Sequence, residues 1–203
     1  YSTQDERAWA RKKAQQWGKR NILWSLAGSS GHKVWPHLDA VIAGLMLTYQ
    51  DVHVVLVGDE FCRVLEAGWE NEPRVHRQCG KWSIRESMAF AEVADLIIGT
   101  ETGLLNAAGM MDTPKIITLS HSSQENLTKH WVNTIALEQP EGVGCPKHPC
   151  HQLHGAEGHD PWEDCPQYAD ENIKAAQCQY HVDAQMMYDA IDQVLSRRLK
   201  QAA

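Results

Sequence analysis

Short apolar runs alternate with longer amphipathic stretches over roughly the first two thirds of the chain. Continuously apolar runs that end at a turn residue are typical of parallel strands covered on both faces, and the amphipathic stretches are typical of crossover helices. The pattern predicts strands at residues 21–26, 52–57, 75–77, 95–98, 115–119 and 134–137. It predicts helices at residues 4–17, 36–49, 60–67, 84–93, 103–110 and 183–199. This alternation indicates a doubly wound, Rossmann-like α/β domain with a parallel sheet.

Several predicted helices carry a start signal. Ser83 and Glu86 have the spacing of a capping box, in which each side chain accepts from the other residue's backbone amide. Pro36 suits a first helical turn, and Asp183 suits the N-cap of the last helix. These signals fix where three of the helices are expected to begin.

The periodic pattern stops between residues 139 and 178. This stretch holds five of the eight prolines, four of the six cysteines, four glycines and four histidines. A compact domain rarely contains about 40 irregular residues without a cross-link or a function. We therefore divide the chain into a linker helix (1–19), an α/β domain (20–138), a Cys/His-rich segment (139–181) and a carboxyl-terminal helix (182–203).

Composition excludes several classes of protein. With 43% hydrophobic residues the chain can bury a core, and the formal charge of −7 argues against a nucleic-acid or polybasic membrane binder. No apolar run approaches the roughly 20 residues of a membrane span, and the amino end lacks the order of a signal peptide. We expect a soluble, intracellular protein without a transmembrane segment, and the Tyr at position 1 suggests a processed or excised chain.

Ligands of open α/β sheets collect at the carboxyl ends of the strands, so the loops there are the first candidates for a site. The loop at 27–36 offers small residues, the hydroxyls of Ser29 and Ser30, and the charge of Lys33. This composition suits a phosphate cradle, although it is neither a Walker A loop nor GxGxxG. The alternative is an ordinary glycine-serine turn with a solvated lysine.

The loop after the fourth predicted strand places Glu101, Thr102 and Gly103 at a helix start. The amides of Thr102 and Gly103 are expected to be free for an anion, and Glu101 is expected at the mouth, where it can accept from sugar hydroxyls. Alternatively, Glu101 complements the helix dipole and Thr102 is only an N-cap.

The loop at 120–127 has seven polar residues among eight. It suits a polyol or diphosphate, yet serine and asparagine also simply cap helices. The Ser-His-Ser run in this loop does not indicate a hydrolase, because the chain contains no G-x-S-x-G elbow.

Five motifs occur together in one order. They read Gly-Ser-Ser-Gly-His-Lys-Val-Trp-Pro at 28–36, Val-Val-Leu-Val-Gly-Asp-Glu at 54–60, Gly-Lys-Trp-Ser-Ile-Arg-Glu at 80–86, Ala-Asp-Leu-Ile-Ile-Gly-Thr-Glu-Thr-Gly at 94–103 and Asp-Thr-Pro-Lys at 112–115. This set resembles the carboxyl-terminal half of glycosyltransferase family 9, the ADP-heptose:lipopolysaccharide heptosyltransferase family. The resemblance implies one half of a GT-B fold, namely the domain that binds the nucleotide-sugar.

Roles for individual residues follow from the resemblance. Ser29, Ser30 and Lys33 would contact the diphosphate, with Lys33 as the catalytic cation that stabilises the leaving group. Asp59 or Glu60 would meet the ribose, and the segment at Lys81 and Trp82 would line the base pocket. Thr102 and Gly103 would offer amides to the phosphates. Glu101, which stands where the family has Asp, would hold the donor sugar, and Asn106 stands where the family usually has His, so the sugar stays open.

The resemblance also implies a chemistry. It implies an inverting, metal-independent transferase that uses no catalytic cofactor and moves a sugar, with ADP-sugar as the favoured donor, to a cell-envelope or lipopolysaccharide-type glycan. The acceptor and the catalytic base would belong to an amino-terminal domain that this chain lacks, so we expect the chain alone to bind without turnover. The expected location is the cytoplasm, at the inner face of the inner membrane. The alternative is a nonenzymatic sugar-nucleotide or polyol-binding module that uses its Cys-rich segment for partner contact.

Four cysteines of the irregular segment are candidate metal ligands. They are Cys145, Cys150, Cys165 and Cys178. Four cysteines in a non-secreted chain favour structural zinc, with a histidine able to replace one thiolate, although the spacing lacks a CxxC pair. Two disulfides or unlinked thiols are the alternatives, and Cys62 and Cys79 are expected in the core.

Overall fold

The computed structural model describes residues 2–28, 30–151, 165 and 175–202. Its centre is one sheet of six parallel strands in the order β3-β2-β1-β4-β5-β6. The strands are β1 (Arg20–Ser25), β2 (Val52–Val57), β3 (Val75–Arg77), β4 (Leu96–Thr100), β5 (Lys115–Thr118) and β6 (Thr134–Leu137). The predicted α/β class is confirmed.

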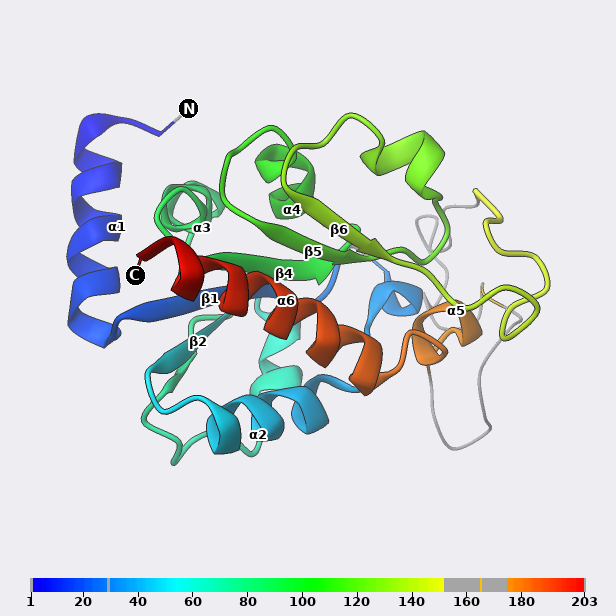
Figure 1. The fold of residues 1–203 in the computed structure, drawn as a ribbon, viewed down its shortest axis with the longest axis horizontal. Helices are drawn as coiled ribbons and strands as arrows, with labels where there is room; N and C mark the ends of the chain where they lie inside the picture. The colour runs from blue at the N-terminus through cyan, green and yellow to red at the C-terminus, as the bar shows by residue number, and fades with distance from the viewer. Residues whose placement is uncertain (1, 29, 152–164, 166–174, 203) are drawn as a thin grey trace.

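Helices cover both faces of this sheet (Figure 1). They are α1 (Gln4–Trp17), α2 (Leu38–Thr48), α3 (Ile84–Ala91), α4 (Gly103–Ala108), α5 (Gln177–Tyr180) and α6 (Ala184–Ala202). Short 3₁₀ turns η1 (Gly31–Lys33) and η2 (Phe61–Glu66) and a π turn η3 (Gln124–Thr128) complete the described elements. No helix in this part of the chain is both long and apolar enough to cross a bilayer.

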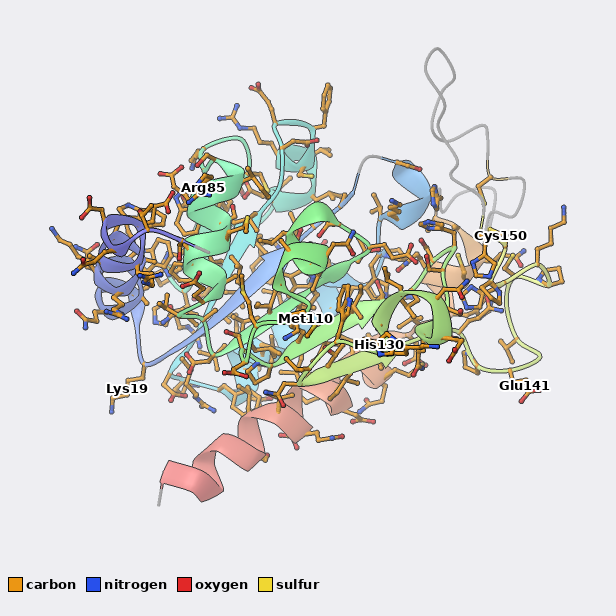
Figure 2. All side chains as sticks on the ribbon, turned by 90° about the horizontal axis from the view of Figure 1, so that it is seen from above. Lys19, Arg85, Met110, His130, Glu141 and Cys150 are labelled. Carbon is orange, nitrogen blue, oxygen red and sulfur yellow. The ribbon has the colours of Figure 1, made fainter. Side chains whose placement is uncertain are left out.

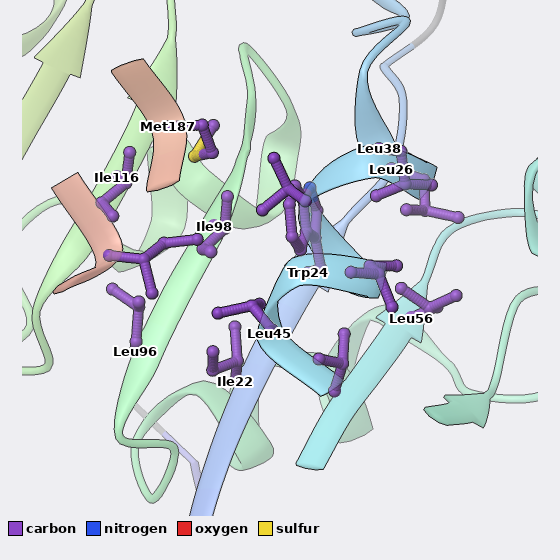
Figure 3. Packing of buried hydrophobic residues seen from close by; sticks show 14 of the residues in the cluster. Ile22, Trp24, Leu26, Leu38, Leu45, Leu56, Leu96, Ile98, Ile116 and Met187 are labelled. Carbon is purple, nitrogen blue, oxygen red and sulfur yellow. The ribbon is translucent and has the colours of Figure 1, made fainter. Parts of the chain in front are cut away.

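The two-residue period of the strands divides the core into two layers. Ile22 and Trp24 of β1 face α2 and α6, whereas Leu23 between them faces α1, α3 and α4. Figure 3 shows the first layer, in which Ile22, Leu45 and Met187 pack around the sheet. Because the central residues of β1, β2, β4 and β5 are buried on both faces, these strands appear as largely apolar runs, with most of their polar residues near the ends.

The predicted helix starts are confirmed at two positions. Ser83 and Glu86 form the capping box of α3, and the Asp183 carboxylate accepts from the Met186 amide at 2.8 Å. Pro36 does not begin a helix, since α2 starts at Leu38 with His37 as its N-cap.

The segment at 60–67 is a 3₁₀ turn rather than the predicted α-helix. Its apolar side chains do not form a core stripe, because Phe61 and Val64 are 89% and 75% exposed. The buried positions are Cys62 and Glu66, and the Glu66 carboxylate accepts from the Cys79 amide at 2.9 Å. Contacts to the neighbouring β3 loop, rather than helix propensity, therefore shape this turn.

The order in which successive strands join the sheet reverses between β1 and β4, while all strands stay parallel. From β1 the strands continue outward through β2 and β3 on one side, and β4, β5 and β6 lie on the other. The loops that follow β1 and β4 diverge at such a point and leave a crevice at the carboxyl ends of the strands. The fold thus brings together the three loops that sequence analysis singled out.

Candidate functional site

A cleft of about 400 Å³ lies at the carboxyl edge of β1, β2 and β4. Four of its lining residues are predicted site residues, namely Asp59, Trp82, Thr102 and Gly103. Gly28 and Ile84 are among its other lining residues. The cleft has one aromatic wall, one carboxylate and a floor of small residues, which suits a ligand with a flat ring and a polar tail.

A second hollow of about 560 Å³ adjoins the first. The two share Ala27, Gly28 and Asp59, and the second adds Ser30 and the exposed apolar side chains of η2. The loop after β1 therefore forms the partition between the first cleft and a more apolar hollow.

Lys33 is a nearly buried cation that lies behind Gly28 of this partition and is not itself among the lining residues of either hollow. Its residue is 7% exposed, and its Cδ lies 2.8 Å from the position that a Cβ on Gly28 would take. Within the described residues, no carboxylate forms an ion pair with the ammonium. A lysine is seldom buried without an opposite charge, so this position favours an anion supplied from outside.

The contact between Lys33 and Gly28 yields a first prediction. Gly28→Ala puts a methyl group 2.8 Å from Lys33 Cδ and 3.1 Å from the Glu101 carbonyl oxygen, so the lysine must move. We expect ADP affinity, measured by calorimetry, to fall about ten-fold because the charge-assisted contact is displaced. The matched variant Gly44→Ala in α2 meets only a ring atom of Tyr188 at 3.2 Å and should leave the affinity unchanged. Equal affinities for the two variants would contradict the expectation.

Glu101 lies beneath the loops rather than at the mouth of the cleft. Its side chain is 3% exposed, and the carboxylate accepts from the Ser120 hydroxyl and from the Ser122 amide at 2.9 Å. His121 Nδ1 lies 2.6 Å from the same carboxylate. Burial alone would raise the pKa of Glu101. The hydrogen bonds from His121 and Ser120 lower it by more than burial raises it, so the pKa is about 2.

This lowered pKa gives a pH prediction. Because the pKa of Glu101 is about 2 in the fold and has its ordinary value of 4.5 when unfolded, its stabilisation is complete above pH 4.5 and is lost as the pH falls through 2. The difference in unfolding free energy between wild type and Glu101→Gln should therefore narrow by about 2 kcal/mol between pH 7 and pH 3. Urea titrations at the two pH values measure it, and a constant difference would refute the assignment.

Two histidines that sequence analysis did not single out meet above Glu101. The rings of His32 and His121 contact edge to face, with centroids 5.5 Å apart and planes at 81°. His32 also contacts the Ser30 hydroxyl through Nδ1. His32 lies in the 28–36 motif and His121 in the loop after β5, so only the three-dimensional meeting of the two loops reveals the pair.

The start of α4 differs in part from the prediction. The Thr102 amide donates to the Thr100 carbonyl at 2.7 Å, so it is already occupied, and the Thr102 hydroxyl caps the helix by accepting from the Leu105 amide. Gly103 has open space where a Cβ would stand, and Asn106 is exposed on the helix.

The residues expected to meet the nucleoside do not all face the cleft. Asp59 is exposed at the cleft wall, and its Oδ1 accepts from the Cys62 amide at 3.1 Å. Glu60 instead pairs with Arg63 at 3.0 Å, and the Lys81 ammonium donates to the Arg77 carbonyl at 2.7 Å. Trp82 lines the cleft, whereas Ser29 lies outside the described residues.

Trp82 belongs to an aromatic cluster behind the cleft. Its ring lies 5.0 Å from Trp9, 5.7 Å from Trp17 and 5.2 Å from Phe90, measured between centroids. The cluster joins α1 and α3 to the cleft wall. The position of the wall is therefore fixed by packing rather than by the loop alone.

The cysteines of the irregular segment gather in a small cluster of their own. Cys145, Cys165 and Cys178 are buried together around Ala176, apart from the two main layers. No disulfide joins any two of the described cysteines, and burial together with the Cys145 and Cys165 thiols raises the pKa of Cys178 to about 12. Among the described residues, no group of three or more His, Cys, Asp or Glu side chains is arranged to hold a metal ion. The zinc expectation thus gains no support from the structure.

The irregular segment nevertheless lies against the third loop. The Ser120 carbonyl contacts His148 Nδ1 at 2.8 Å, and the His151 amide donates to the His121 carbonyl at 2.8 Å. Figure 2 places Cys150, in the described part of this segment, at the end of the molecule opposite Lys19. The segment is therefore a neighbour of the Glu101 network.

One family model matches this chain. The model described as "Glycosyltransferase family 9 (heptosyltransferase)" matches residues 1–143. No curated protein matches the chain significantly.

Solved structures share the fold at low sequence identity. E. coli ADP-heptose lps heptosyltransferase II matches with a TM-score of 0.69 and 13% identity, over 100% of this chain and 54% of its own. The glycosyl transferase family 9 structure from Veillonella parvula gives 0.69 and 13%, over 97% and 53%. E. coli heptosyltransferase WaaC with ADP gives 0.60 and 13%, over 91% and 48%. The chain spans about half the length of these structures.

Proposed function

The chain belongs to glycosyltransferase family 9, and we propose that it is the part of such an enzyme that binds a nucleoside diphosphate sugar. The proposal concerns the donor side of the reaction. The activity, the acceptor and the partners of the whole protein are part of the proposal, since the chain spans about half of its structural neighbours.

The observation that carries the proposal is the position of Lys33. A cation that is 7% exposed, beside Gly28 of the cleft lining and without a described carboxylate partner, needs an anion to offset its desolvation. A diphosphate in the cleft supplies that charge, and the neighbouring Gly28 lets its oxygens approach the backbone. Lys33 then stabilises the negative charge that develops on the diphosphate as the glycosidic bond breaks.

The nucleoside is proposed to lie between Trp82 and Asp59. The indole offers a flat apolar face to a base, and the exposed carboxylate can accept from ribose hydroxyls. Adenine is the preferred base in the proposal, because the family description and the neighbours' names refer to heptosyltransferases and ADP.

The proposed reaction is an inverting substitution at the anomeric carbon. The acceptor oxygen forms the new bond from the face opposite the diphosphate, which leaves with the electron pair of the broken bond. A base must take the acceptor proton, and we place that base on the acceptor side, outside the cleft described here. The proposed acceptor is a lipopolysaccharide-type glycan at the cytoplasmic face of the inner membrane.

Calorimetry with ADP, UDP, GDP and adenosine tests the donor side. We expect ADP to bind most tightly, and adenosine to bind at least about ten-fold more weakly because it lacks the groups that Lys33 contacts. The result that would overturn the proposal is that none of the three diphosphates binds at millimolar concentration.

A further inference from the structure

The carboxylate of Glu101 is turned away from the cleft and fully engaged by the loop after β5. Ser120, His121 and Ser122 all reach it, with the Ser122 amide on one oxygen and the other two groups on the second. The lining of the cleft runs through Thr102 and Gly103, the residues that follow Glu101, and does not include Glu101 itself. The charge of this residue therefore acts inside the protein.

The backbone of Glu101 lies under the loop after β1. Its carbonyl oxygen is 3.1 Å from the point where a Cβ on Gly28 would stand, and Lys33 Cδ is 2.8 Å from the same point. The Glu101 carbonyl and the Lys33 stem therefore both face the side of Gly28 where a Cβ would stand, and only a glycine leaves room for both.

His121 connects the carboxylate of Glu101 to the turn that carries Lys33. Its Nδ1 is held 2.6 Å from Glu101 Oε2, and its ring contacts the ring of His32 edge to face. His32 directly precedes Lys33 in the single turn η1, which is closed by the Lys33 and Val34 amides donating to the carbonyls of residues 30 and 31 at 3.1 Å and 3.0 Å. A fixed imidazole at 121 therefore gives the turn that carries Lys33 a rigid support.

We propose that Glu101 and His121 are positioning residues that hold the Lys33 turn over the cleft. Glu101 fixes His121, His121 fixes His32, and the turn presents the Lys33 ammonium to the diphosphate. This inference rests on the proposed function for its ligand. Glu101 then acts on the ligand only indirectly. His121, which belongs to none of the five motifs, supports the turn that carries Lys33.

A double-mutant cycle tests this relay from Glu101 through His121 to the Lys33 turn. His121→Leu removes the hydrogen bond to Glu101 and should weaken ADP binding about ten-fold in calorimetry. His121→Gln retains an N–H donor for the carboxylate and should keep most of the affinity. In a Lys33→Met background, His121→Leu should cause no further loss, because the group that it positions is already gone. Full additivity of the two changes, or equal losses for Leu and Gln, would overturn the relay.

Hydrogen exchange tests the positioning without any ligand. The amides of Lys33 and Val34 should exchange at least about ten-fold faster in His121→Leu than in wild type, because the turn loses its support. His130→Leu, at an exposed position after η3, is the matched control and should leave both rates unchanged. If wild type binds no nucleoside diphosphate, the proposed function fails, yet this measurement still decides the relay. Unchanged exchange in His121→Leu would refute it.

Discussion

Replacing Lys33 by Met should weaken ADP binding about 30-fold and leave the fold at least as stable. The methionine keeps an apolar stem against Gly28 but removes the ammonium, and a hydrogen bond to a charged group is worth about 2 kcal/mol. The free energy of unfolding should not fall, because the variant no longer buries a cation without a described partner. Calorimetry and urea denaturation measure the two quantities.

Lys19→Met is the matched control for this change. Lys19 is exposed immediately before β1, at the opposite edge of the sheet, and its removal changes the net charge equally. Its ADP affinity should equal that of wild type at physiological salt, where exposed charges beyond about 8 Å are screened. A similar loss of ADP affinity in both variants would mean that the diphosphate responds to the net charge of the chain and not to a specific site at Lys33.

Replacing Trp82 by Ala should reduce both stability and nucleotide affinity. The indole packs against Trp9, Trp17 and Phe90, and truncation of a packed Trp costs about 3 kcal/mol of unfolding free energy. The same ring lines the cleft, so a stacked adenine should lose about 1 to 3 kcal/mol of binding free energy. Trp82→Phe should recover part of both, since it keeps a flat ring in the wall.

Trp69→Ala separates these two effects. Trp69 is half-buried, packs against the other core layer and donates to Asp39 at 2.7 Å, and it is not among the residues that line the cleft. We expect this variant to lose stability and retain its ADP affinity in the same pair of measurements. If Trp82→Ala behaves in the same way, the base does not lie on this wall.

The strands could be predicted from the sequence, because strands buried on both faces give short apolar runs that are not easily confused with surface helices. Runs such as that of β2 are too short and too continuously apolar for surface helices, and the capping box at Ser83 has a local signature. The 3₁₀ turn at η2 could not be foreseen, because it depends on the buried contact between Glu66 and the Cys79 amide. Local sequence does not encode a contact between distant segments.

The candidate site shows the same limit. The sequence places Lys33, Trp82 and Glu101 at one edge of the sheet, since parallel strands bring their carboxyl ends together. It cannot show that Glu101 turns inward, because that orientation depends on donors from the loop after β5. The docking of His148 and His151 against that loop is likewise a product of tertiary structure, and it makes the Cys/His-rich segment a neighbour of the site.

A crystal structure of the chain with ADP tests the central claim most directly. The account predicts the diphosphate beside Gly28 and the Lys33 ammonium, with adenine on the face of Trp82 and ribose near Asp59. ADP bound elsewhere, for example in the hollow of about 430 Å³ formed by residues 138–149, would contradict it. So would an unchanged, empty cleft in crystals grown at a saturating concentration of ADP.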